Sequence, residues 1–333
     1  MSETIREVEA AAPWFFPLAV FIFGACWGSF LNVVIYRVPA GKSVVTPGSQ
    51  CACGKPIDWY DNIPILTWFL RGGKARCCDL RFSIRYPIIE LLTAVLFLIA
   101  WLMLPPAVAL AGFIFIGLMI AATFIDLDTM TLPDAITVSG CIAGVLLSVA
   151  LPQVHGYIGN EPYLIKGIRS GVTAIIGAAV GSGVILWIAL SAEAILRKEA
   201  MGFGDVILMG CIGAFCGWQG ALFAIFGGAL MGCIIVLPVM ILQKVFCLKT
   251  PAPGKVIAAG DEGVSAQLDA EEAQKNQSDE ATTGSEEQPQ LGLGAAIPFG
   301  PWLALGGLVY YLGLRGWVDG YLSTLQEVIF MPL

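Results

Sequence analysis

The sequence predicts an all-α polytopic membrane protein of about eight transmembrane helices, with a small cytoplasmic loop domain. Of the 333 residues, 57% are apolar and only 13% are charged, and the mean hydropathy is +0.79. A soluble domain carries roughly a quarter charged residues. Apolar runs approaching the length of a transmembrane helix, about 20 residues, also recur along the chain. Most of the protein surface is therefore expected to face lipid.

Eight apolar windows define the expected helices in chain order. They cover residues 14–36, 87–104, 107–125, 135–152, 171–193, 205–217, 219–243 and 293–314. Pro105 and Pro106 separate the second window from the third, because proline ends a helix. The segment 217–220 (Gly-Trp-Gln-Gly) is the only break between the sixth and the seventh. The first window shows no cleavage pattern of a signal peptide, so we expect it to be retained.

Lys and Arg residues predict the orientation, because cytoplasmic loops are enriched in them. The loop 37–85 holds eight of these residues, and the segments 193–204 and 244–292, which an alternating topology puts on the same side, add two and four. The opposite side holds four. We therefore expect the loop to be cytoplasmic and both termini to lie outside.

The same pattern divides the chain into five parts. These are an outer N-terminus with the first helix (1–36), a cytoplasmic Cys-rich loop (37–86), a membrane core (87–246), an acidic insert (247–292) and the last helix with an outer-face tail (293–333). Residues 251–292 hold nine acids against two Lys, and we expect this part to be disordered. The rest of the chain balances 16 acids with 16 bases, so no basic face for nucleic acid is expected.

Carboxylates at membrane helices are costly and mark functional sites. Asp126 and Asp128 follow the third window, and Asp205 opens the sixth after Gly202 and Gly204. The topology places both helix ends at the cytoplasmic edge. Asp126 lies deeper toward the apolar run than Asp128, so it is the better candidate for burial. Asp205 could instead be a first-turn acid that suits the helix dipole.

Two carboxyl groups a few ångströms apart cannot both ionise easily, so they share a proton. The ionised group can take a proton from water while the neutral group donates to a scissile carbonyl. Gly202 and Gly204 leave room for another backbone to approach Asp205. This hydrolysis needs no metal and no histidine, and it suits a chain whose single histidine, His155, is expected on the opposite side.

Two alternatives stand beside hydrolysis. Intramembrane acids also mark ion pathways, which would fit a transporter or a proton channel. The acids could also serve only as helix caps in a non-catalytic assembly component. Asp134 itself follows Thr131 and Pro133 in a pattern similar to a capping box, and we interpret it as structural.

Four of the ten cysteines, Cys51, Cys53, Cys77 and Cys78, fall in the polar loop. Four thiolates match a closed structural zinc site, and a cytoplasmic location argues against disulfides. The spacings are CxC and CC, whereas zinc sites more often use CxxC pairs. We expect a zinc site, with reduced and unliganded thiols as the alternative.

Motifs along most of the chain resemble those of the type IV prepilin peptidases, a family of GxGD-type aspartic intramembrane proteases. The matching segments are 28–37 (GSFLNVVIYR), 59–64 (WYDNIP), 85–91 (RYPIIEL), 125–127 (IDL), 132–134 (LPD), 202–205 (GFGD) and 298–301 (PFGP). They occur in the family's order. Jointly they are far more specific than any one of them alone.

The resemblance implies a bifunctional enzyme of the bacterial inner membrane with its active site on the cytoplasmic side. It would cleave the basic leader from membrane-inserted prepilins and pseudopilins, which serve type IV pili and type II secretion, and then N-methylate the new N-terminus with S-adenosylmethionine. Asp126 and Asp205 would be the catalytic pair, with Gly202 and Gly204 in support. The cysteine loop would bind zinc and belong to the methyltransferase function.

The sequence departs from the family's usual pattern in three places. Gln50 and Ala75 stand near positions where two further cysteines would complete CxxC pairs, so a peptidase that has lost methyltransferase activity is the alternative. Ile207 replaces a lysine that often follows the second aspartate. The acidic insert is longer than expected, and the sequence assigns it no function.

Overall fold

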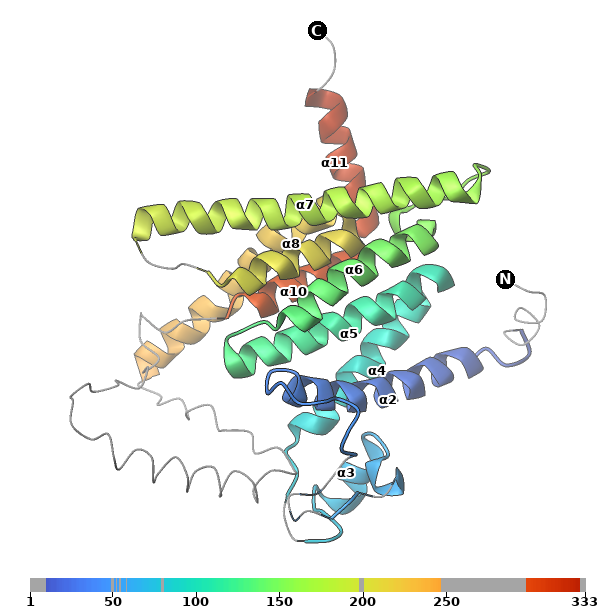
Figure 1. The fold of residues 1–333 in the computed structure, drawn as a ribbon, viewed down its shortest axis with the longest axis vertical. Coiled ribbons are helices and arrows are strands. Elements are labelled where there is room, and N and C mark those ends of the chain that lie inside the picture. The colour runs from blue at the N-terminus through green and yellow to red at the C-terminus, as the bar shows by residue number, and fades with distance from the viewer. Residues whose placement is uncertain are drawn as a thin grey trace.

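The computed structural model describes residues 10–48, 51, 53, 55–57, 59–78, 81–197, 201–246 and 298–329. These residues form a helical bundle (Figure 1), which confirms the predicted all-α class. The helices of the bundle are α2 (Phe15–Arg37), α4 (Arg85–Met103), α5 (Pro106–Thr129), α6 (Asp134–Ala150), α7 (Tyr163–Leu196), α8 (Phe203–Phe246) and α10 (Gly300–Val309). The shorter or outlying elements are η1 (Trp59–Asn62), α3 (Leu66–Arg71), η2 (Pro152–His155), the π-helical turn η3 (Tyr310–Leu314) and α11 (Arg315–Ile329). The predicted acidic insert lies outside the described residues.

Five apolar helical stretches in the described part of the chain have the length to cross a membrane, namely α2, α4, α5, α7 and residues 203–236 of α8, although the last of these bends back at Gly217. The chain is therefore a multi-pass membrane protein, while the number of eight spans stays a prediction. α7 begins at Tyr163, well before the predicted residue 171. The hydropathy window misses its first turns because Lys166 and Arg169 make them polar.

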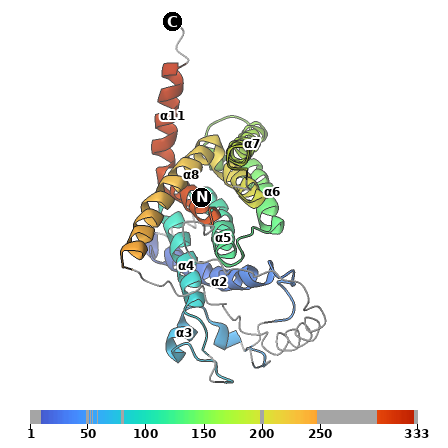
Figure 2. The ribbon, with the colours of Figure 1, turned by 90° about the vertical axis from the view of Figure 1, so that its left-hand side faces the viewer.

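α8 reverses its direction at Gly217, whose backbone angles (φ 74°, ψ −179°) are not helical. Beyond this residue, Gly220 lies against Tyr310 and Gly228 against Trp302, so this second arm is antiparallel to α10. The first arm starts beside the first residue of α10 and runs parallel to it. Figure 2 shows the two arms as an inverted V. The bend falls where the sequence predicts a break between two helices.

α2 and α4 touch each other through two glycines spaced four residues apart. A Cβ on Gly28 would lie 2.6 Å from the Cα of Glu90, and a Cβ on Gly24 would lie 2.7 Å from the Cα of Ala94. Small residues at this spacing let helix backbones approach closely in a membrane. The contact fixes the first turns of α4, and with them Glu90, against α2.

An ion pair ties the start of α4 to the end of α5. Arg85 donates through Nη1 to Asp128 Oδ1 and through Nη2 to Asp128 Oδ2, both at 2.7 Å. The same guanidinium donates to the carbonyl of Phe124 at 3.2 Å. This fork geometry is directional as well as strong. It positions the last turns of α5, which contain Asp126.

Aromatic packing holds α5, the first arm of α8 and the turn η3 that follows α10 together. The ring of Phe115 lies 5.0 Å from that of Phe215 and 5.2 Å from that of Tyr311, measured between centroids. All three side chains are buried. Because protein interiors pack densely, a core of this kind holds the three elements in one arrangement. α11, by contrast, leads away from the bundle in both views (Figures 1 and 2).

Candidate active site and cysteine cluster

Asp126 near the end of α5 and Asp205 in the first turn of α8 lie together. A Cβ on Gly300 would lie 2.6 Å from Asp126 Oδ2 and 3.3 Å from Asp205 Oδ1. Asp126 Oδ2 and Asp205 Oδ1 are therefore no farther apart than the sum of these two distances. Both side chains are buried, with 6% and 9% exposure. The structure thus brings together two acids that are far apart in the sequence.

Gly300, the first residue of α10, contacts both acids. Its backbone N–H hydrogen-bonds to the carboxylate of Asp126, at the positive end of a helix. Asp126 Oδ2 is buried and finds no hydrogen-bond partner among the described residues. Buried polar atoms are nearly always paired, so this oxygen is suited to a shared proton or to a group of a substrate. In the sequence Gly300 is part of the motif 298–301, and no local pattern indicates its contact with the acids.

The two glycines before Asp205 have different surroundings. A Cβ on Gly204 would lie 2.8 Å from Leu132 Cβ, so this glycine lets the loop between α5 and α6 approach. A Cβ on Gly202 would meet no atom within 4 Å among the described residues. Neither glycine has a positive φ. Only Gly202 therefore leaves open space beside the pair.

The other two acids of this region, Asp128 and Asp134, have structural roles. Asp128 is bound to Arg85, as described above. Asp134 is exposed and begins α6, where the helix dipole favours an acid. The capping-box-like pattern is not formed, because α6 has no side-chain cap hydrogen bond and the hydroxyl of Thr131 donates instead to Thr129. The interpretation of Asp126 as the more buried acid is confirmed.

The single histidine lies just after the C-terminal end of α6 and contacts a serine. His155 Nε2 lies 3.0 Å from Ser148 Oγ and 3.2 Å from the carbonyl oxygen of Ala214. Because a carbonyl only accepts, Nε2 carries the proton and cannot act as a base toward Ser148. Ser148 is also fully buried. This pair is therefore a structural contact and does not form a nucleophile.

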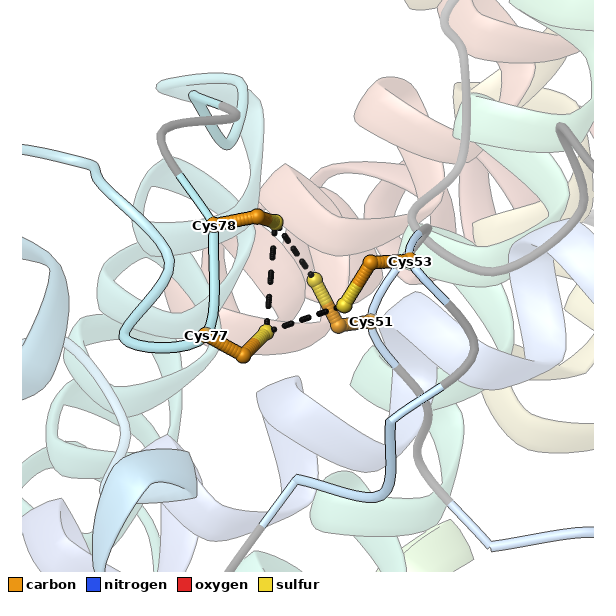
Figure 3. Close-up of side chains that lie close together, drawn as sticks. All are labelled: Cys51, Cys53, Cys77 and Cys78. Atoms are coloured by element: carbon orange, nitrogen blue, oxygen red, sulfur yellow. Dashed lines mark hydrogen bonds between the residues drawn. The ribbon is translucent and has the colours of Figure 1, made fainter.

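The four loop cysteines converge (Figure 3), and their sulfur atoms all lie within 4.8 Å of one another. The separations are 3.4 Å for Cys51–Cys78, 3.2 Å for Cys53–Cys77 and 3.9 Å for Cys77–Cys78. A tetrahedral zinc ion binds sulfur at about 2.3 Å, which requires sulfur atoms a little under 4 Å apart. The residues therefore fit a metal ion despite their unusual CxC and CC spacing.

Hydrogen bonds shift the pKa values of two thiols of the cluster in opposite directions. The backbone of Lys55, followed by the thiol of Cys77, lowers the pKa of Cys53 to about 7. Hydrogen bonds with Cys51 and then Cys53 raise the pKa of Cys77 to about 12. A metal would have to displace the protons that remain, so its affinity is expected to rise with pH.

A cavity of about 870 Å³ lies between the cysteine cluster, the end of α2 and the start of α4. Cys51 and Cys77 line it on one side and the buried acid Glu90 on another. Glu90 was not predicted as a site residue, although it belongs to the matching segment 85–91. Its place within an apolar helix was the available signal, because a carboxylate is costly there.

A multi-pass helical protein with two buried carboxyl groups at one end of the bundle has the architecture of a membrane-embedded hydrolase. Two family models match the chain in succession. The one for the bacterial peptidase A24 N-terminal domain covers residues 22–104, and the one for the type IV leader peptidase family covers residues 113–237. The chain belongs to the type IV leader peptidase family, which confirms the resemblance found in its motifs.

Curated relatives agree with this assignment. Proteins named prepilin leader peptidase/N-methyltransferase are 36% identical over 67% of the chain and 64% of the relative from Myxococcus xanthus, and 36% identical over 65% of the chain and 91% of that from Klebsiella pneumoniae. A protein of that name from Neisseria gonorrhoeae is 34% identical over 69% of the chain and 84% of its own length. The chain thus spans less than two thirds of the first relative and most of the other two. No solved structure matches.

Proposed function

We propose that this protein is a bifunctional enzyme that cleaves the leader peptide from type IV prepilins and pseudopilins and N-methylates the N-terminus it exposes. Asp126 and Asp205 are the catalytic pair, with Gly202 and Gly204 in support. The observation that supports the proposal most strongly is the approach of both buried carboxyl groups to one point beside Gly300. The names of the relatives support the same two activities.

Hydrolysis follows from the pair alone. The two carboxyl groups share one proton, and the titration belongs to the pair rather than to either residue. The ionised group takes a proton from a water molecule, whose oxygen attacks the scissile carbonyl carbon. The neutral group donates its proton to the carbonyl oxygen, and collapse of the tetrahedral intermediate releases the leader. This chemistry requires no metal.

The substrate matches the depth of the site. A prepilin has a basic leader in the cytoplasm followed by an apolar helix in the membrane. Its cleavage point therefore lies where α5 ends and α8 begins, provided that the Lys- and Arg-rich loop faces the cytoplasm. The proposed location is thus the bacterial inner membrane, with the carboxyl pair on the cytoplasmic side.

Methylation is assigned to the cytoplasmic part, which covers residues 37–86. S-adenosylmethionine supplies an activated methyl group when bound. Cys51, Cys53, Cys77 and Cys78 would hold zinc as a structural ion, since a closed four-cysteine site leaves no open position for a substrate. The ion would keep the two halves of the loop together around the cavity, and it takes no part in leader cleavage.

The proposal is tested with purified protein in detergent and a prepilin substrate, read by mass spectrometry. Asp126→Asn and Asp205→Asn should each lower the rate of leader cleavage by about 10³-fold or more, because a group that transfers protons typically contributes 10²–10⁴-fold. Asp134→Asn is the matched control, since that acid is exposed, and it should cleave at the normal rate. Normal cleavage by either of the first two variants would contradict the assignment of that residue.

The same spectra separate the two activities. Methylation adds the mass of one methylene group to the mature N-terminus. A protein that cleaves without this addition, even with S-adenosylmethionine and zinc supplied, would be a peptidase only. That result would favour the alternative that the altered cysteine spacing has cost the second activity.

A further inference from the structure

Leader cleavage leaves the 870 Å³ cavity beside the cysteine cluster without a role. Its volume falls within the range of about 300–1,000 Å³ that is typical of small-molecule sites. Trp68, Phe82 and Tyr86 give it aromatic walls, and six Lys or Arg residues line it. A cavity with aromatic and basic walls suits a ligand that combines a flat ring with a carboxylate.

Glu90 is the only acid among the described residues that line the cavity. It lies one and a half turns into α4, and 8% of its surface is exposed. Its Oε2 accepts a hydrogen bond of 2.7 Å from the backbone N–H of Ile65, and its carboxyl also hydrogen-bonds to Ser29. The close contact between Gly28 and the backbone of Glu90 fixes the position of this carboxyl group.

The backbone that Glu90 binds is strained. Ile65 has φ 62° and ψ −56°, and the N–H of Leu66 donates to the carbonyl of Pro64, which makes a tight γ-turn. A positive φ is a genuine outlier for a β-branched residue. Strained backbone of this kind collects at functional sites, where the surrounding structure holds it in place. Glu90 therefore joins a membrane helix to a strained turn at the wall of the cavity.

The cavity and the carboxyl pair lie at the same end of the bundle. Arg85 at the start of α4 binds Asp128 near the end of α5. Glu90 follows Arg85 by about 7.5 Å along its helix, and Asp126 precedes Asp128 by about 3 Å along its own. Glu90 and Asp126 thus both lie a short distance from the Arg85–Asp128 ion pair, toward the middle of the bundle. A new N-terminus formed at the carboxyl pair need not cross the membrane to reach Glu90.

We propose that this cavity binds the methyl donor and the new N-terminal amine together, and that Glu90 is the catalytic residue that binds the amine. This inference rests on the proposed methyltransferase function. A cationic amine beside a buried carboxylate makes a charge-assisted hydrogen bond. The basic residues suit the carboxylate of an amino-acid methyl donor, and the aromatic residues suit its ring.

Methyl transfer begins at the new N-terminus, whose ammonium group gives one proton to Glu90 and becomes a neutral amine. Its freed electron pair forms a bond to the methyl carbon of a sulfonium donor, the carbon–sulfur bond breaks, and its electron pair returns to sulfur. The products are a methylated ammonium and a neutral thioether, and Glu90 releases its proton to solvent before the next turnover.

The test uses Glu90→Gln in the full-length protein, because glutamine still accepts the hydrogen bond from Ile65 but carries no charge. The substrates are an intact prepilin and a pre-cleaved peptide with a free N-terminus. We expect normal leader cleavage and methylation slowed by at least about 100-fold on both substrates. Glu161→Gln, an exposed glutamate at the other end of the bundle, is the matched control and should leave both activities unchanged.

Binding provides a readout that is independent of turnover. Isothermal titration of S-adenosylmethionine should give a similar dissociation constant for Glu90→Gln and the wild type, because Glu90 holds the amine and not the donor. A second variant, Thr67→Trp, places an indole in the cavity. It should remove donor binding and leave leader cleavage intact.

Several outcomes would overturn the inference. Methylation by Glu90→Gln within about 3-fold of wild type would exclude a role for the charge, and loss of donor binding in that variant would show that Glu90 holds the donor instead. Normal donor binding by Thr67→Trp would place the donor elsewhere. Absence of methylation by the wild type itself would mean that the proposed function has failed, a result distinct from the other three.

Discussion

Buried polar groups lie at both ends of the helical bundle, and they differ in whether a group without a hydrogen bond can carry a charge. At one end Ser148 and His155 hydrogen-bond with each other and with the carbonyl of Ala214, while the neutral amide oxygen of Gln153 is buried without a partner among the described residues. At the other end Asp126 keeps one buried oxygen without a partner among the described residues, close to Asp205.

The difference separates a structural contact from a reactive one. The paired serine and histidine stabilise the fold, and the unpaired amide oxygen of Gln153 neither ionises nor transfers a proton at neutral pH. A buried carboxyl oxygen without a partner is costly, and such a group is retained where chemistry uses it. The histidine and serine would attract attention in a sequence, yet their geometry excludes nucleophilic catalysis.

The largest expected effect comes from filling the space between the two acids. Gly300→Ala places a methyl group 2.6 Å from Asp126 Oδ2, so the carboxyl groups must move apart. A displacement of about 1 Å can cost 10²-fold in rate, and we expect leader cleavage to fall by at least that factor. The comparison variant is Gly183→Ala in α7, whose Cβ would meet no atom within 4 Å among the described residues. Equal rates for the two variants would contradict the geometry of the pair.

A smaller effect on stability is expected when acid protonates His155, at the other end of the bundle. Burial, and then the charge of Arg315, lower the pKa of His155 to about 4, whereas an unfolded chain has a histidine of ordinary pKa. The neutral form therefore contributes stability that is present above about pH 6.5 and is lost as the pH falls toward 4. Thermal unfolding in detergent should show a loss of about 2 kcal/mol by pH 4.5. His155→Gln should remove that part of the pH dependence, and an unchanged slope would show that other groups cause it.

The smallest effect is expected at the ion pair that positions α5. Arg85→Lys keeps the charge but loses the fork that holds both oxygens of Asp128. Because the pair is partly exposed, we expect a stability loss of only about 1 kcal/mol and a few-fold slower leader cleavage. Arg169→Lys alters an exposed ion pair with Glu161 at the other end and should change neither quantity. If the two variants behave alike, Arg85 does not position the site.

The sequence was sufficient for features that depend on the periodicity and sidedness of helices. Asp126 and Asp205 meet because an alternating topology puts the end of one helix and the start of another at the same depth. The bend at Gly217 falls in the only segment that interrupts a long apolar run. The four cysteines converge as expected from their shared polar loop, although their spacing alone left a metal site uncertain.

Other features depend on tertiary contacts that leave no local pattern. Gly300 follows a long insert, and its amide could not be assigned to Asp126 before the helices were placed. The turn at Ile65 contradicts the backbone preference of isoleucine, so local propensity would have excluded it. Glu90 was visible as an acid within an apolar helix, but its cavity exists only because this turn folds back onto α4.

The bend in α8 also has a consequence for how water reaches the site. The arm that carries Asp205 ends at Gly217 and is therefore only about 20 Å long. The hydrocarbon layer of a bilayer is about 30 Å thick, so this arm cannot reach from one surface to the other. From Asp205 to Gly217 nearly every residue of this arm is buried, so the surrounding helices, and not lipid, cover it. The water that the hydrolysis consumes must therefore reach the carboxyl pair between protein segments and not through lipid.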